Sequence, residues 1–283
     1  MKITFLGTAS AHSYPLTFCQ CTYCKQAMVI GGPSLRKRAS VLINRDLLID
    51  LGPDIMTASF NHNISLSGIR YCLQTHPHSD HLAVNLLLTR HPEYAGVDIP
   101  PLHFYASRGT LQVASEMAKT ESADADLFDP VYCKQMLNLE IHEVRALQKF
   151  DVGNYRVTAF PANHHPQVEP LLYAVSDGSQ TVFYGIDTAV MPEETWQGFH
   201  QHNLQFDIVI LDHTYGSGFS RGDHLDATQF IQHIRRMREE GLLTNKARIY
   251  ATHISHEGNP PHPELSRFAV LNGYEIAYDG LVI

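Results

Sequence analysis

A short run of metal-binding side chains dominates this sequence. Residues 75–81 spell T-H-P-H-S-D-H, which places four side chains that commonly bind metal ions within six positions: His76, His78, Asp80 and His81. The run 69–74 before it is rich in β-branched and aromatic residues and predicts a buried strand, while residues 82–90 have helical apolar spacing. We therefore expect the four side chains in a loop between a strand and a helix.

The spacing within this loop favours two metal ions over one. His76 and His78 can face one ion, while Asp80 and His81, after a turn of the backbone, can face a neighbouring ion. Neutral imidazoles and a carboxylate suit Zn²⁺, Mn²⁺ or Fe²⁺, and the residues alone do not choose among these ions. The weaker interpretation is a group of solvated loop histidines without metal.

At these residues the chain resembles the metallo-β-lactamase superfamily, whose H-x-H-x-D-H motif lies in such a loop. Further landmarks follow the superfamily's order along the chain: Asp50 after the strand 47–50, His164 after the strand 155–161, Asp187 in G-I-D-T and His253 in A-T-H. The resemblance implies that His164 and His253 bind metal, with His165 as a competing choice for the former. It also implies that Asp187 bridges two ions and that Asp50 orients a ligand from behind.

The same resemblance implies the fold, an α/β four-layer αβ/βα sandwich (the metallo-β-lactamase fold) in one domain over residues 1–283. Periodicity by itself supports only a mixed α/β class. The expected strands are 2–6, 40–43, 47–50, 69–75, 102–105, 139–144, 155–161, 171–175, 181–185, 208–212, 248–252 and 275–278. The expected helices are 82–90, 110–119, 227–240 and 265–271. Acidic, turn-rich residues 121–129 predict an exposed connection, and helix 227–240 should bury one stripe: Ala227, Phe230, Ile231, Ile234 and Met237.

A second group of ligand side chains is C-x-C-x-x-C at Cys19, Cys21 and Cys24, which we expect in a loop near residues 19–24. Clustered thiols in a chain without a signal peptide favour metal over disulfides, and three thiolates need a fourth ligand to close a structural Zn²⁺ site. The candidate is His256, three residues after His253, so that one segment serves both sites. The alternative is a reduced cysteine cluster without metal. Two further cysteines are expected to be small buried hydrophobes: Cys72 and Cys133.

Together with the cysteines, these motifs resemble the superfamily branch that includes the phosphoribosyl 1,2-cyclic phosphate phosphodiesterases of bacterial phosphonate breakdown. This branch is related to the tRNA 3′-processing ribonucleases, and a relative in the pyrroloquinoline quinone pathway carries similar cysteines. The resemblance implies hydrolysis of a phosphodiester with two catalytic ions, commonly Mn²⁺ or Zn²⁺, besides one structural Zn²⁺. Residues 108–150 depart from the branch in being longer and more acidic, so the reaction class is better defined than the substrate.

The chemistry of such a centre also follows from general principles. Two ions about 3.5–4 Å apart, bridged by one carboxylate, make hydroxide available near neutral pH and clamp the phosphate oxygens during in-line attack. We expect Asp187 to be the bridge, and we count Asp80, Asp187 and His224 as catalytic residues. The departing alkoxide needs a proton, and His224, in the glycine-rich loop before helix 227–240, is the candidate donor. The alternative is a histidine that merely precedes a helix capped by Asp226.

The other histidines carry less information. His213, next to Asp212 at a strand end, is a further candidate for the pocket or a structural residue. We expect the remaining histidines, among them His103 and His142, to be structural or exposed.

The charge and hydropathy of the chain limit the kinds of partner that it can bind. The net charge of −8, from 21 Lys and Arg against 29 Asp and Glu, disfavours nonspecific binding of nucleic acid or membranes. The first residues, M-K-I-T-F-L-G-T, are too short an apolar run for a signal peptide, and no window reaches the roughly 18 apolar residues of a membrane span. We expect a cytoplasmic protein, either a monomer or a homodimer.

Three functional hypotheses follow. The first is a dinuclear metal-dependent phosphodiesterase that hydrolyses a small anionic, cyclic phosphodiester or nucleotide, favoured by His224 and the acidic charge. The second is a metal-dependent hydrolase of another ester class, such as lactones, and the third is a metalloprotein of cofactor biosynthesis. RNA processing is a weaker fourth, because binding a tRNA normally demands a strongly positive surface.

Overall fold

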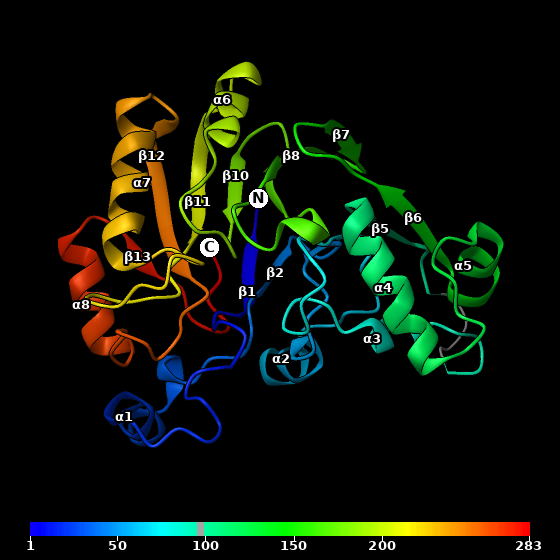
Figure 1. Cartoon of the computed structure of the whole chain (residues 1–283), viewed down its shortest axis with the longest axis horizontal. Helices are drawn as coiled ribbons and strands as arrows, with labels where there is room; N and C mark the ends of the chain where they lie inside the picture. Colours follow the sequence, from blue (N-terminus) through cyan, green and yellow to red (C-terminus); the bar gives the residue numbers. More distant parts are fainter. Residues whose placement is uncertain (95–98) are drawn as a thin grey trace.

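The computed structural model describes residues 1–94 and 99–283, in which two β-sheets pack face to face between two outer layers of helices (Figure 1). The first sheet has the spatial order β1 (Ile3–Gly7), β2 (Ser40–Ile43), β3 (Leu47–Ile49), β4 (Tyr71–Leu73), β5 (Leu102–Ala106) and β6 (Leu139–Glu143). The second has the order β13 (Glu275–Ile276), β12 (Leu243–Thr252), β11 (Phe206–Asp212), β10 (Thr181–Gly185), β9 (Leu171–Ser176), β8 (Tyr155–Pro161) and β7 (Lys149–Val152). The expected four-layer α/β sandwich is confirmed.

Helices cover the outer faces because both sheets contain parallel strands, β3 to β6 and β10 to β13. Parallel neighbours need a crossover connection, which is usually a helix packed on the sheet. Four helices cover the first sheet: α2 (Ile55–His62), α3 (Val84–Leu88), α4 (Arg108–Glu121) and α5 (Pro130–Leu137). Three others cover the second sheet: α6 (Glu193–Gln201), α7 (Ala227–Glu239) and α8 (His262–Leu271). Helix α1 (Thr22–Ile30) lies apart from the strands, below α8 in Figure 1, and contributes Cys24 and Ala27 to the same apolar cluster.

The layer between the two sheets is apolar. Alternate residues of both sheets are buried there, including Phe5 and Ile49 from the first sheet and Ile210 from the second. Tyr173 on β9 also lies in this layer and donates a hydrogen bond of 2.8 Å to the carbonyl of Gln74, just after β4. The second sheet therefore holds the start of the metal-binding loop of the first sheet.

The strand directions gather the candidate site at one edge. Strands β8 and β10 are each antiparallel to β9, and β10, β11 and β12 are parallel to one another. The strands β8, β10, β11 and β12 therefore run in the same direction and end at the same edge of the second sheet. The acidic and histidine side chains at or just beyond their carboxyl ends are His164, Asp187, Asp212 and His253. Ligands of α/β proteins commonly bind at the carboxyl ends of parallel strands, and this fold brings residues from distant parts of the sequence there.

Some expected elements differ from those observed. Five short elements of four to nine residues did not emerge from the pattern, because periodicity is weak over so few residues: α1, α2, α5, α6 and β7. Strand β12 begins at Leu243, earlier than expected, whereas β4 and α3 are shorter than expected. The expected exposed connection 121–129 is partly wrong, since Ala125 and Leu127 are buried in the helical layer of the first sheet. In α7, His233 is buried, while Ile231 is only partly buried.

No helix in the described ranges 1–94 and 99–283 has the length and apolarity needed to span a bilayer.

Candidate metal centre

The loop that follows β4 is held from behind by the carboxylate of Asp50, which is fully buried after β3. One oxygen of this carboxylate accepts hydrogen bonds from the Thr75 N–H (2.9 Å), the Thr75 hydroxyl (2.8 Å) and the Gln74 side-chain amide (3.1 Å). Its other oxygen lies 2.8 Å from His81 Nδ1. Because this contact fixes the His81 ring, Nε2 of His81 is directed at the candidate centre.

Three imidazoles form the first ligand group, His76, His78 and His164, whose ligand nitrogens lie within 4.8 Å of one another. His164 Nε2 is 3.2 Å from His78 Nδ1, and His76 Nε2 is 3.3 Å from Asp187 Oδ2. Burial lowers the pKa of each of these imidazoles, and it holds the pKa of His76 well below its usual range. The three rings are therefore in the neutral form that binds divalent ions.

The second ligand group consists of Asp80, His81, Asp187 and His253, whose ligand atoms also lie within 4.8 Å of one another. Asp80 Oδ2 is 2.8 Å from His81 Nε2 and 3.7 Å from His253 Nε2. Burial alone would lower the pKa of His81, but the surrounding carboxylates, led by Asp80 and Asp187, raise it well above its usual range. The electrostatic field at this point therefore favours positive charge.

Asp187 lies between the two ligand groups. Its Oδ2 is 3.4 Å from His253 Nε2 in the second group and contacts His76 in the first, while its Oδ1 is 3.6 Å from His164 Nε2. Burial opposes ionisation of Asp187, but the imidazoles, led by His253 and His81, hold its pKa well below the usual range. A carboxylate in this position can contact ions held by either group.

Four buried polar atoms at this point form no well-aligned hydrogen bond with the described residues, although they lie within 4 Å of one another or of Asp80: Nε2 of His76, Nε2 of His81, Nε2 of His253 and Oδ2 of Asp187. An unsatisfied buried polar atom costs about 1–3 kcal/mol, so such atoms are rare unless something else binds them. Here they converge on one space, and they are nitrogen and oxygen donors of the kinds that Zn²⁺ and Mn²⁺ accept. The residues present thus fit a centre of divalent ions.

His224 lies beside this centre, as expected, and it has a partner that the sequence did not single out. His224 Nδ1 is 3.1 Å from Asp212 Oδ2 and 3.2 Å from Asp187 Oδ1. The fully buried Asp212 also accepts hydrogen bonds of 2.9 Å from the backbone N–H groups of Asp187 and Thr214. Burial would lower the pKa of His224, but Asp212 and Asp187 raise it to about 9.

Two other candidate histidines lie outside both ligand groups. His165 is exposed, and although its ring centroid is 5.4 Å from that of His78, the ring is not among the converging ligands. His213 is fully buried with its Nε2 3.0 Å from the Tyr274 hydroxyl, and its ring packs against Phe230 of α7. The structure thus brings His164 rather than His165 into the centre and gives His213 a place in the core.

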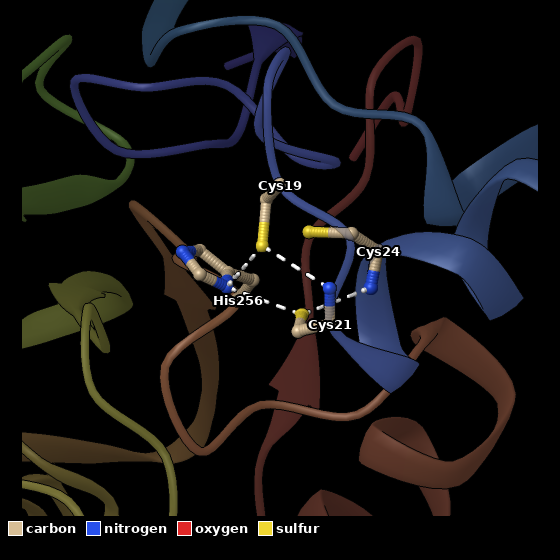
Figure 2. Close-up of side chains that lie close together, drawn as sticks. All are labelled: Cys19, Cys21, Cys24 and His256. Atoms are coloured by element: carbon tan, nitrogen blue, oxygen red, sulfur yellow. Dashed lines mark hydrogen bonds between the residues drawn. The ribbon is translucent and has the colours of Figure 1, made fainter.

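The three cysteines and His256 come together from opposite ends of the chain (Figure 2). His256 Nδ1 is 3.4 Å from Cys21 Sγ and 3.7 Å from Cys19 Sγ, and all four ligand atoms lie within 4.8 Å of one another. A tetrahedral Zn²⁺ at its usual bond lengths separates sulfur and nitrogen ligands by about 3.6 Å, so the spacing suits this ion. The cysteines are not in a simple loop, because Cys21 caps the start of α1 and Cys24 lies in its first turn.

The thiols differ in their tendency to ionise. Burial raises the pKa of Cys24 to about 12. Burial also opposes ionisation of Cys21, but hydrogen bonds from the Cys24 backbone N–H and from His256 outweigh it and lower the pKa of Cys21 to about 6. Of these two thiols, Cys21 is therefore the one that ionises more readily. Cys72 and Cys133 are buried apart from the cluster, as expected.

A cavity of about 400 Å³, lined mostly by polar and charged residues, opens onto the candidate centre. Asp80, Asp187 and His224 line its floor, and the loops after β1 and β11 contribute residues that the sequence did not single out: Ser10, His12, Tyr215 and Arg221. Arg221 is paired with Glu257 at 2.6 Å on the same wall. Loops far apart in the sequence build these walls, so no local motif could identify them.

Comparison with known proteins places the chain in a family. A family model described as beta-lactamase superfamily domain matches residues 45–254. Ribonuclease Z of Mycobacterium bovis (strain BCG / Pasteur 1173P2) is 26% identical over 196 residues, which cover 65% of this chain and 62% of that protein. Ribonuclease Z of Mycobacterium marinum is 27% identical over 203 residues, which cover 68% and 64%. The matches therefore span less than two thirds of the length of these curated relatives.

Solved structures share the fold over the whole chain. A diphosphatase from the PhnP family superposes with a TM-score of 0.73 at 23% identity, covering 100% of this chain and 96% of that one. Zinc-bound PqqB from Methylobacterium extorquens superposes with a TM-score of 0.70 at 19% identity, covering 100% and 99%. At these identities the likeness extends to the architecture alone.

The adjacent pair His164 and His165 offers a matched test of the first ligand group. We expect His164→Ala to lower the divalent-metal content by about one ion per chain, because a ligand nitrogen is lost, and His165→Ala to leave it unchanged. The measurement is elemental analysis of the two variants and the parent protein, purified in parallel. Equal metal content in all three proteins would remove His164 from the ligand set.

The cysteine cluster should contribute to stability rather than to chemistry. We expect Cys21→Ser to lower the melting temperature and to remove one zinc ion, because a structural zinc contributes folding free energy. Cys133→Ala, which changes a buried thiol outside the cluster, should retain the full zinc content. Calorimetric melting with elemental analysis checks both variants. Unchanged stability of Cys21→Ser together with lost turnover would place the cysteines in the active site instead.

Proposed function

The chain belongs to the β-lactamase superfamily, and from that premise we propose that it is a metal-dependent phosphodiesterase acting on a small phosphodiester. The observation that carries the proposal is the position of Asp187, between two ligand groups whose buried atoms converge without well-aligned hydrogen bonds. The names ribonuclease and diphosphatase among the relatives and neighbours support a phosphorus-ester substrate.

We assign one ion to the group of His76, His78 and His164, a second ion to the group of Asp80, His81 and His253, and Asp187 to both. When bound, two Zn²⁺ or Mn²⁺ ions supply a nucleophile from water near neutral pH and offset the charge of the phosphate. The chain's own residues fix the ligands: Asp50 holds His81 through Nδ1, and the Thr214 hydroxyl lies 2.7 Å from His253 Nδ1. Such support orients each ring and strengthens binding of the ion.

We assign protonation of the leaving oxygen to His224. This side chain lines the cavity next to Asp187, which supports a role beside a bound phosphate. His224 also belongs to a further cluster of possible ligands with Asp187, Asp212 and His253, but each of the two groups assigned to ions above has at least three ligands without it. Asp212 acts as its positioning residue, since the contact of 3.1 Å holds the ring and favours its protonated form. Asp212 also accepts a hydrogen bond from the Asp187 N–H. One buried carboxylate therefore positions both His224, the proposed acid, and Asp187, the proposed bridge.

The cavity favours a small substrate. Its volume of about 400 Å³ is in the range of pockets that enclose a single small molecule, such as a cyclic sugar phosphate or a nucleotide. The net charge of −8 gives little attraction for a long polyanion such as RNA. A small anionic phosphodiester is therefore the substrate class that we propose.

The second candidate is cleavage of RNA, which the relatives named ribonuclease Z favour. It requires a basic surface near the cavity to hold the RNA backbone. Arg221 lines the cavity, but its charge is paired with Glu257. A small phosphodiester does not require such a basic surface around the cavity, so we favour it over RNA as the substrate.

A substrate panel tests the proposal. Protein reconstituted with Zn²⁺ or Mn²⁺ should hydrolyse bis(p-nitrophenyl) phosphate and a ribose cyclic phosphate, while p-nitrophenyl phosphate, a monoester, serves as the control. Turnover of lactones without turnover of diesters would replace the proposal with another ester class. Cleavage of precursor tRNA alone would favour RNA processing, and full metal content without any turnover would favour a biosynthetic or binding role.

His224→Ala tests the assignment of the acid. We expect turnover of diesters with alkoxide leaving groups to fall by about 10²- to 10⁴-fold, because such groups leave poorly without a proton. The loss on a p-nitrophenolate leaving group should be much smaller, and metal content should not change. Steady-state rates on both substrates, with elemental analysis, make the comparison.

His202→Ala, a histidine outside the cavity, is the control for this series. Equal losses on both substrates would mean that His224 anchors the phosphate. Loss of one ion would mean that it is a ligand, and unchanged rates would leave it a structural residue.

A further inference from the structure

A third group of ligand side chains lies on the first sheet, away from the centre and from the cysteines. His103 on β5 and Glu140 and His142 on β6 have ligand atoms within 4.8 Å of one another. We propose that these three side chains form a further site for a divalent metal ion of the zinc class. The proposal does not depend on the proposed phosphodiesterase function.

The strand pairing explains why the three side chains meet. Strands β5 and β6 are parallel, with His103 opposite Glu140 and Tyr105 opposite His142. Since side chains alternate between the faces of a strand, His103, Glu140 and His142 share one face, and Phe104 packs into the helical layer on the other. Strand β6 is the last strand of its sheet, so the group lies at an open edge.

The distances suit one ion. His103 Nδ1 is 3.1 Å from His142 Nε2 and 3.3 Å from Glu140 Oε2. Ligands about 2.0–2.1 Å from a tetrahedral Zn²⁺ are themselves about 3.3–3.4 Å apart, which is close to both values. The single proton that His103 Nδ1 can carry satisfies only one of its two neighbours, whereas an ion between the three atoms satisfies them all.

Aromatic stacking holds the two imidazoles in place. The His142 ring stacks on Tyr105 at 4.4 Å between centroids, and the His103 ring stacks on Tyr71 at 5.6 Å. Phe150 of β7 stacks on the far side of this group, against Tyr105 at 5.5 Å. The ligands are thus ordered before an ion arrives.

The site is open to solvent and separate from the catalytic centre. The His103 and Glu140 side chains are 30% and 44% exposed, which gives an ion from solution direct access and leaves room for water as the remaining ligand. His103 is opposite Tyr71 at the start of β4, whereas the metal-binding loop of residues 75–81 follows the end of that strand. A bound ion would join β5 to the edge strand β6 and stabilise that edge.

Zinc titration of the metal-loaded protein tests the proposal. At a buffered free Zn²⁺ concentration, the parent protein should bind one equivalent beyond its resident ions, and its melting temperature should rise with added Zn²⁺. His142→Ala and Glu140→Gln should each lose this equivalent and the rise. His200→Ala is the matched control, because His200 is an exposed histidine paired with one carboxylate, Glu240, at 2.7 Å.

Glu140→Gln keeps the shape of an exposed side chain, so it decides the question even if His142→Ala fails to fold. The proposal is supported if Glu140→Gln loses the additional equivalent while His200→Ala retains it. It is overturned if the parent protein binds no additional zinc, or if all of the variants bind as much as the parent.

Discussion

The contacts of the Asp187 carboxylate connect the two candidate ligand groups. It follows β10 in the second sheet, yet its oxygens reach His76 of the loop after β4 in the first sheet and His253 after β12. Its position is set by the buried Asp212, which accepts the Asp187 N–H and contacts His224. The candidate ligands of the two sheets lie close together because the sheets pack face to face, a packing to which the Tyr173 hydrogen bond to Gln74 contributes.

The segment after β12 contributes to two separate groups of candidate metal ligands. His253 belongs to the second ligand group and His256, three residues later, belongs to the cysteine cluster. We expect an ion bound among the cysteines to hold His256 in place and, through the backbone, the segment that carries His253. Of these four side chains, only His256 lines the cavity that opens onto the candidate centre.

The sequence predicted what depends on local spacing. The ligands of residues 75–81 are close in the chain. Strands such as β8 and β10 matched their expected ranges, because runs of five to seven residues rich in β-branched and aromatic side chains are a strong pattern. The sequence did not predict Asp212 as a site residue. Its role depends on contacts with Asp187 and His224, and the spacing of these residues along the chain does not indicate such contacts. Short helices such as α1 were also missed, because their stability comes from tertiary packing more than from their own pattern.

Anomalous X-ray diffraction from crystals of the metal-loaded protein, recorded on both sides of the absorption edge of the loaded metal, tests the shared role of Asp187 most directly. The account predicts two peaks at the catalytic edge, one beside each ligand group, with the Asp187 carboxylate in contact with both. A single peak in fully active protein, or two peaks neither of which contacts Asp187, would contradict it.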